Sequence, residues 1–247
     1  MLPTPEARLQ ARERPAGAPV MHQTWRDLLF LHWRFDPSTI QDSLPAGLTV
    51  DTFEGDAWVG IVPFKMRKIR PAGLPSVPYV SNFLELNLRT YAHDENGTPG
   101  VWFYSLDASR LLAVLVARMT FHLPYYWSRM ATRADREGVI TYRCRRWWGA
   151  DRHQSEYRYR QTGPLTTAEP GTLEFFLVER YVLFSPLSEG RLTTGRVHHP
   201  PYQFAPCHLT QWDTSVFRVQ GLEEPTGPPV HALFSPGVDV EVFPLDR

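Results

Sequence analysis

Strict alternation between leucines and polar residues is the feature that most constrains the fold of this chain. In residues 83–91 every second position from 84 to 88 is a leucine, and Glu85, Asn87 and Arg89 complete the pattern. This period of two places the leucines on one face of a β-strand and the polar side chains on the other. Shorter runs separated by Gly and Pro predict further strands at 48–53, 57–66, 101–106, 139–144, 157–160, 181–184, 191–197, 215–219, 230–234 and 238–243. Many short strands with few helices indicate a mostly β (α+β) fold, a sandwich or a barrel.

Few segments favour a helix. Asp36-Pro37-Ser38 provides an N-cap residue followed by proline at the first helical position, which predicts a short helix over Asp36–Leu44. Residues 109–120 are apolar on nearly all sides, which is typical of a helix buried against a sheet. Residues 173–180 are a further candidate. Residues 25–35 are densely apolar and are compatible with either a helix or a strand.

Two connections carry clear signals. Glu54-Gly55-Asp56 lies between the expected strands 48–53 and 57–66 and predicts that these strands form a hairpin. Residues 70–80 contain three prolines, so we expect an irregular loop there.

Composition is typical of a globular cytoplasmic protein. The chain is 43% hydrophobic and its formal net charge is zero, so nothing draws the whole molecule to nucleic acid or to an anionic membrane. Residues 1–20 are rich in proline and lack the apolar centre of a signal peptide, so we expect a disordered leader followed by a single domain at 21–247. No apolar run is long enough to span a membrane. Cys144 and Cys207 are isolated, which favours reduced thiols but leaves one disulfide open.

One motif points to a pocket. Residues 117–126 have the outline of the Gly-Arg-Glu-x4-Pro-Lys-Lys signature of acetoacetate decarboxylase, with Arg118 at the arginine position. Tyr125 and Tyr126 stand where that family has its two lysines, and Met119 replaces the glutamate. The first lysine of the family forms the Schiff base. Because a phenol cannot condense with a ketone to an iminium, the motif suggests the fold and the pocket but not the family's chemistry.

Further motifs resemble those of the uncharacterised YqjF-like family within the acetoacetate-decarboxylase-like superfamily. They are the sequences at 31–37, 44–48, 85–91, 99–103, 105–108 and 123–126. The resemblance runs from Trp25 nearly to the C-terminus. It implies a closed β-barrel with packed helices and an internal pocket. This is an analogy at the level of the fold and does not by itself establish a function.

The resemblance also suggests candidate ligand-binding residues. Arg26 lies where the decarboxylase has an arginine facing its substrate, and Glu85 lies near one of the pocket glutamates. The second pocket glutamate falls near Val62 and is therefore absent. The candidate ligand-binding residues are Arg26, Glu85, Arg89, Arg118, Tyr125 and Tyr126; Tyr125 and Glu85 are also the candidate catalytic residues.

Each candidate has a structural alternative. The simpler reading of the two tyrosines is an aromatic core with satisfied hydroxyls, and the commoner place for an arginine such as Arg26 is the surface. Arg118 is as readily explained by pairing with Asp107 or Glu85 as by ligand binding. Lys65 is the remaining candidate for an iminium, although a lysine extended toward solvent is the simpler reading.

Metal and nucleic-acid sites are not supported. Adjacent His198 and His199 point to opposite sides of a strand and cannot share one ion, so we expect no metal and no cofactor. Residues 142–148 and 157–160 mix aromatic and basic side chains in the way of a single-stranded nucleic-acid surface. Their period of two is explained more simply by rings that pack inward and arginines that face water.

Three functional hypotheses follow. The first is a protein that binds a small carbonyl or carboxylate compound inside the barrel. The second is an enzyme without a Schiff base that uses Tyr125 or Glu85 for proton transfer. The third is a structural or nucleic-acid interaction protein. We further predict that Glu85 and Arg89 face the barrel interior, that the 109–120 helix covers the leucines from outside, and that Glu85 pairs with an arginine. The sequence indicates no oligomeric state.

Overall fold

A computed structural model describes residues 2–246 except 78–79, 112–122, 147–151 and 188–190. The described elements are α1 (Pro5–Ala11), β1 (Met21–Phe35), α2 (Pro37–Asp42), β2 (Thr49–Val50), β3 (Ala57–Pro71), β4 (Phe83–His93), β5 (Pro99–Ala108), β6 (Tyr125–Trp127), β7 (Arg129–Ala134), β8 (Ile140–Arg146), β9 (His153–Gln161), α4 (Leu173–Val178), β10 (Val182–Pro186), β11 (Leu192–His198), β12 (Ala205–Gln211), α5 (Ser215–Val219) and β13 (His231–Val242). The protein is thus mostly β, as predicted.

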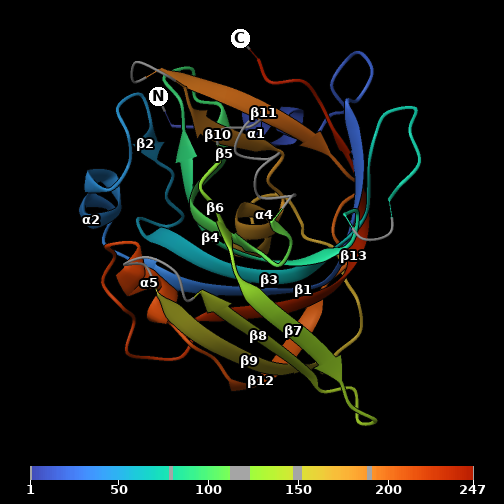
Figure 1. Ribbon diagram of the computed structural model, residues 1–247. Helices are drawn as coiled ribbons and strands as arrows, with labels where there is room; N and C mark the ends of the chain where they lie inside the picture. Colours follow the sequence, from blue (N-terminus) through green and yellow to red (C-terminus); the bar gives the residue numbers. More distant parts are fainter. Residues whose placement is uncertain (1, 78–79, 112–122, 147–151, 188–190, 247) are drawn as a thin grey trace.

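Seven strands are hydrogen-bonded into a closed ring in the order β1-β3-β4-β5-β10-β11-β13, and β13 pairs with β1 to complete it. All of these pairs are antiparallel except β5 with β10. Helix α4 lies across the inside of the ring (Figure 1), where Phe176, Leu177 and Val178 join the core cluster of the interior. The ring interior is therefore closed by a helix rather than by side chains of the strands alone.

A second layer of strands covers one outer side of the ring (Figure 1). It continues from β13 through β12, β9, β8 and β7. Its buried tyrosines Tyr142, Tyr157 and Tyr159 pack in one cluster with Leu86 and Leu88 of β4. Because this layer supplies the apolar cover for the leucine face, the polar face of β4 is left for the interior.

Several local predictions are confirmed. Helix α2 begins after Asp36, whose carboxylate accepts hydrogen bonds from the backbone N–H of Ser38 and Thr39. Helix α4 falls within the predicted 173–180 segment. The undecided 25–35 segment belongs to strand β1. Both cysteines are free thiols, Cys144 buried and Cys207 half-buried.

Other predictions are wrong, each for a physical reason. Strand β2 pairs with β4, so the 54–56 turn links β2 to β3 without forming the predicted hairpin between them. Residues 215–219 form α5 because the Asp213 side chain accepts from the Ser215 N–H and the adjacent Val216 and Phe217 are both buried, which an alternating strand does not allow. The two strands predicted at 230–234 and 238–243 are one long strand, β13.

The N-terminal segment, expected to be a disordered leader, carries helix α1 in this structure. Thr4 caps α1, and the Arg8 guanidinium makes two hydrogen bonds to the buried carboxylate of Asp51. Arg14 pairs with Glu241 of β13. Arg8 and Arg14 therefore connect the N-terminal segment to Asp51, directly after β2, and to β13 of the ring.

Most of the predicted 109–120 helix lies outside the described residues. Its proposed role as the cover for the leucine face is filled by β8 and β9 instead. Within the described part of the chain, no helix has the length and apolar character needed to cross a membrane.

Candidate functional site

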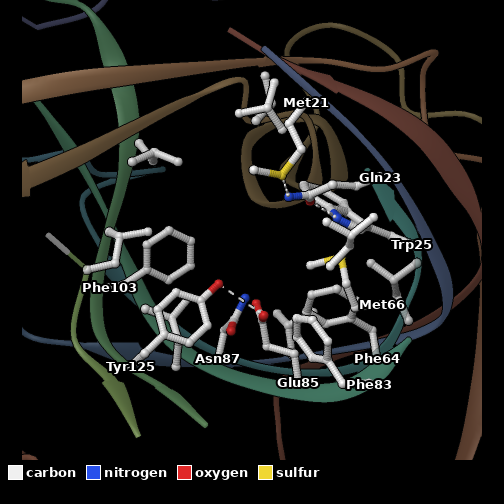
Figure 2. Close-up of a pocket in the computed structure, with 18 of the residues that line it drawn as sticks. Met21, Gln23, Trp25, Phe64, Met66, Phe83, Glu85, Asn87, Phe103 and Tyr125 are labelled. Atoms are coloured by element: carbon white, nitrogen blue, oxygen red, sulfur yellow. Dashed lines mark hydrogen bonds between the residues drawn. The ribbon is translucent and has the colours of Figure 1, made fainter. Parts of the chain in front are cut away.

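A cavity of about 380 Å³ lies inside the ring (Figure 2). Its lining is mainly apolar and comes from β1, β3, β4, β5, β10, β11 and β13. The apolar side chains include Met21, Trp25, Leu28, Val62, Phe64, Met66, Phe83, Val101, Phe103, Leu106, Val178, Val182, Val197 and Val242. Val62, where the second pocket glutamate of the decarboxylases was expected to fall, is on this wall. The cavity has the size and the apolar character of small-molecule sites.

Two bulges decide which residues of β1 and β3 face the cavity. Trp25 and Leu28 both line it although they lie three residues apart, because Asp27 between them has a positive φ of 53°. Lys68, with φ of 50°, has the same effect in β3 between Met66 and Ile69. Each such residue inserts one extra position and reverses the alternation.

A polar cluster interrupts the apolar lining. Glu85 and Asn87 project from β4, and Tyr125 projects from β6 beside them (Figure 2). The Tyr125 hydroxyl donates to Oε2 of Glu85 at 3.0 Å. Tyr125 is brought there because β6 runs parallel to β5, with Tyr125 opposite Leu106.

The carboxyl group of Glu85 is buried without a charged partner among the described residues. Burial raises the pKa of Glu85 to about 8, against smaller opposing effects of hydrogen bonds with Tyr125 and Asn87. Burial and the neighbouring Glu85 raise the pKa of Tyr125 well above its ordinary value. Near neutral pH the cluster is therefore mostly an uncharged acid beside an uncharged phenol.

Asn87 supplies an unused hydrogen-bond acceptor. Its side chain is buried and bonds with Glu85, yet its Oδ1 has no partner among the described groups. A buried amide oxygen without a donor costs about 1–3 kcal/mol. The cluster thus combines an acid O–H with a buried amide oxygen that has no donor among the described groups.

Arg89 is the next residue of the same face, toward α4. Its Nη2 donates to the Leu177 carbonyl at 3.1 Å, and its guanidinium lies over the rings of Phe30 and Tyr91. No carboxylate of the described residues forms an ion pair with it. Arg89 therefore gives the inner end of the cavity a positive charge.

The structure brings only part of the predicted site together. Glu85, Arg89 and Tyr125 line the cavity. Arg26 does not, because the alternation of β1 turns Trp25 inward; the Arg26 guanidinium pairs with Asp239 on the outside. Tyr126, adjacent to Tyr125, points the other way and lies under Arg146, whose Cζ is 3.7 Å from its ring centroid. Arg118 lies outside the described residues.

Two further candidates are Glu85 and Lys65. Among the described residues no arginine pairs with Glu85; of its two expected partners, Arg26 pairs with Asp239 instead and Arg118 lies outside the described residues. Lys65 is on the opposite face of β3 from Phe64 and Met66, and its ammonium pairs with Asp27. Asn87 was not predicted as a site residue, although its shared face with Glu85 was a usable signal.

A second buried polar group lies between the ring and the outer layer. Asp107, Cys144 and His153 are close enough together to hold a metal ion. However, the Asp107 carboxylate already accepts from Ser128, His153 and twice from Arg146. Since these donors occupy its lone pairs and Arg146 brings a positive charge, the group is an ion-pair network that joins β5 to β8 and β9.

The aromatic and basic strands also have a structural explanation. Tyr142, Tyr157 and Tyr159 are buried against β4, while Arg143 and Arg158 are exposed. This arrangement is expected when one face of a sheet packs on the core and the other face is exposed to solvent, because alternate side chains then point to the core and to water.

Comparisons with known proteins agree with this architecture. The family model DUF2071, described as an uncharacterized conserved protein, matches residues 22–239. The uncharacterized protein YqjF of Bacillus subtilis (strain 168) is 34% identical over 234 residues, which cover 94% of each chain.

Similar solved structures come from decarboxylase-like proteins. The enduracididine biosynthesis enzyme MppR complexed with pyruvate has a TM-score of 0.65 at 14% identity, over 93% of this chain and 90% of that one. Acetoacetate decarboxylase from Legionella pneumophila has a TM-score of 0.63 at 14% identity, over 96% and 94%. An acetoacetate decarboxylase-like enzyme from Sphingomonas wittichii RW1 gives 0.62 at 14% identity, over 94% and 93%. At this identity the likeness is one of fold. The chain therefore belongs to the DUF2071 family of uncharacterized conserved proteins and has an acetoacetate-decarboxylase-like fold.

Proposed function

We propose that the protein binds a small carbonyl or carboxyl compound inside its strand ring, which we interpret as the closed barrel of the decarboxylase-like fold. The observation that carries the proposal is the Glu85–Tyr125–Asn87 cluster, which lies in the wall of a mainly apolar cavity. A specific ligand site usually has a mainly apolar wall with a small number of polar groups that orient the ligand. MppR, a protein of similar fold, has been solved with pyruvate, which supports an oxo compound as ligand.

Binding in this proposal is non-covalent. The resemblance to the decarboxylase motif suggests that Tyr125 replaces the Schiff-base lysine, and neither Lys65 nor Lys68 is among the cavity-lining residues. Borohydride reduction in the presence of pyruvate should leave the mass of the intact protein unchanged. An adduct on Lys65 would contradict this part of the proposal.

The direct test is native mass spectrometry of the purified protein, followed by denaturation and identification of any released compound. We expect a small carbonyl or carboxyl compound in the wild-type protein and its loss from Glu85→Ala. The matched control is Glu95→Ala, because Glu95 is exposed on the turn after β4 and does not line the cavity. If both variants retained the compound equally, its binding site would lie outside the Glu85 cluster.

A second candidate function is proton transfer next to a carbonyl. The Glu85 pKa of about 8 favours it, because an acid–base group works best when its pKa is near the working pH. An enzyme of this kind should exchange the α-hydrogens of a bound ketone with D2O, which proton NMR detects. Glu85→Gln should abolish the exchange, while a protein that only binds should show none at all.

The structural and nucleic-acid alternative is less well supported, since the outer tyrosines are already used in packing. A cytosolic location is part of the proposal because both cysteines are free thiols.

A further inference from the structure

The cluster of Glu85, Asn87 and Tyr125 lies on one side of the cavity. In the ring, β4 lies three strands from the β11–β13 seam in either direction, so the two walls face each other. Glu85 and Asn87 are on the β4 wall. On the opposite wall Met21, Val197 and Val242 lie side by side, since Val242 is in register with both of the others. A ligand that fills the cavity therefore meets polar atoms at one end and an apolar surface at the other.

The polar side chain near the apolar wall is already satisfied. The Gln23 amide donates to Sδ of Met21 at 3.2 Å and accepts from the Trp25 indole at 2.8 Å (Figure 2). With its oxygen and nitrogen both engaged, Gln23 has little to offer a ligand. Among the cavity-lining residues that the structure describes, the buried polar atoms without a hydrogen-bond partner are Asn87 Oδ1, Arg89 Nε and Arg180 Nη2. Of these three atoms, only Asn87 Oδ1 is an acceptor.

Glu85 and Asn87 offer a matched pair of groups. Glu85 is buried with no cation beside it among the described residues, so its carboxyl group is uncharged and carries an O–H donor. The amide oxygen of Asn87 is buried and has no hydrogen-bond donor among the described groups. A ligand group that satisfies both must contain an acceptor and a neighbouring donor.

We propose that the ligand is an amphipathic carbonyl compound with an N–H or O–H donor next to the carbonyl, as in a primary carboxamide, and an unbranched apolar body that crosses the cavity to Val197 and Val242. This rests on the proposed function and specifies its ligand class. The carbonyl oxygen accepts from Glu85, the donor binds Oδ1 of Asn87, and the apolar body replaces water along the opposite wall.

The head group is tested with an isosteric pair. Octanamide and 2-nonanone differ only in NH2 against CH3, so titration calorimetry at pH 6.5 isolates the donor. We expect octanamide to bind roughly tenfold more tightly, because the ketone leaves Asn87 unpaired. Asn87→Leu should remove the preference. The comparison of octanamide with 2-nonanone needs only the wild-type protein, so it remains a valid test even if the Asn87→Leu variant does not fold. Equal binding of the pair would overturn the proposal, as would tighter binding of octanoate, which would assign the head group to Arg89.

The apolar body is tested by chain length. Octanamide should bind on the order of 100-fold more tightly than butanamide, because it buries four more methylene groups. Val242→Phe should reduce that ratio to less than tenfold. Val230→Phe, at an exposed position outside the cavity, should preserve it.

The outcomes separate this inference from the proposed function. If butanamide and short ketones bind while octanamide does not, the ligand class is wrong and the site remains. If no amide, ketone or acid binds and the purified protein carries nothing, the proposed function fails as well.

Discussion

The Tyr125 hydroxyl donates a 3.0 Å hydrogen bond to the buried carboxyl of Glu85, across the intervening strand β5. In this arrangement the phenol contacts an acid that is itself mostly protonated near neutral pH. The two groups thus form an uncharged hydrogen-bonding pair on the wall of the cavity.

Glu85→Gln should change how stability depends on pH. The pKa of Glu85 is raised from 4.5 to about 8 on folding, so the native state holds its proton more tightly than the unfolded state. The free energy of unfolding of the wild-type protein should therefore fall by on the order of 4 kcal/mol as the pH rises from about 5 to about 8. The glutamine variant should lose much less. Urea unfolding at a series of pH values measures both slopes, and equal slopes would refute the assignment to Glu85.

Tyr125→Phe should raise the pKa of Glu85 further, because the phenol hydrogen bond stabilises the ionised form. Carbon-13 NMR of labelled glutamate carboxyls follows this titration directly. Tyr126→Phe is the matched control, since Tyr126 faces Arg146 rather than the cavity, and its carboxyl titration should match that of the wild-type protein. A shift in the control alone would mean that the wrong tyrosine has been assigned.

Arg146→Met should lower the free energy of unfolding by about 3–5 kcal/mol, because it leaves the Asp107 carboxylate buried without its cation. Arg158→Met, at an exposed position of β9, should change it by less than about 0.5 kcal/mol. The double variant Asp107→Leu with Arg146→Met should recover part of the loss. Chemical denaturation of the three variants decides the point: a small effect of Arg146→Met would show that the network is not fully buried.

Gly237→Ala should destabilise the ring strongly. Gly237 has φ of +121°, and an added Cβ would lie 1.9 Å from the Trp25 carbonyl oxygen across the β1–β13 pair. We expect a loss of roughly 3 kcal/mol or more, since both the backbone conformation and the close approach require glycine. Gly227→Ala, where nothing lies within 4 Å, should be nearly neutral. Thermal unfolding that ranks the two equally would contradict this strand pairing.

Local sequence patterns predicted the elements well where the deciding interactions are local. The N-cap of α2 and the alternation of β4 were both found, because each depends on neighbouring residues. Segment 215–219 failed because its alternating pattern was too short to separate a strand from one helical turn. The suggestion that Arg26 faces the ligand was not matched by the structure, because a position inferred from a related family does not reveal whether its side chain points into the cavity.

The alternation in the sequence alone determined that Glu85, Asn87 and Arg89 share a face, since the pleat of a strand is a local property. Only the tertiary structure decided that this face is the inside. Both faces of β4 are largely buried, so composition could not distinguish them; the choice depends on the outer strands that cover the leucines and on the closure of β1 against β13, more than 200 residues apart in the chain. The meeting of Tyr125 with Glu85, and the raised pKa that burial produces, likewise exist only once the ring has formed.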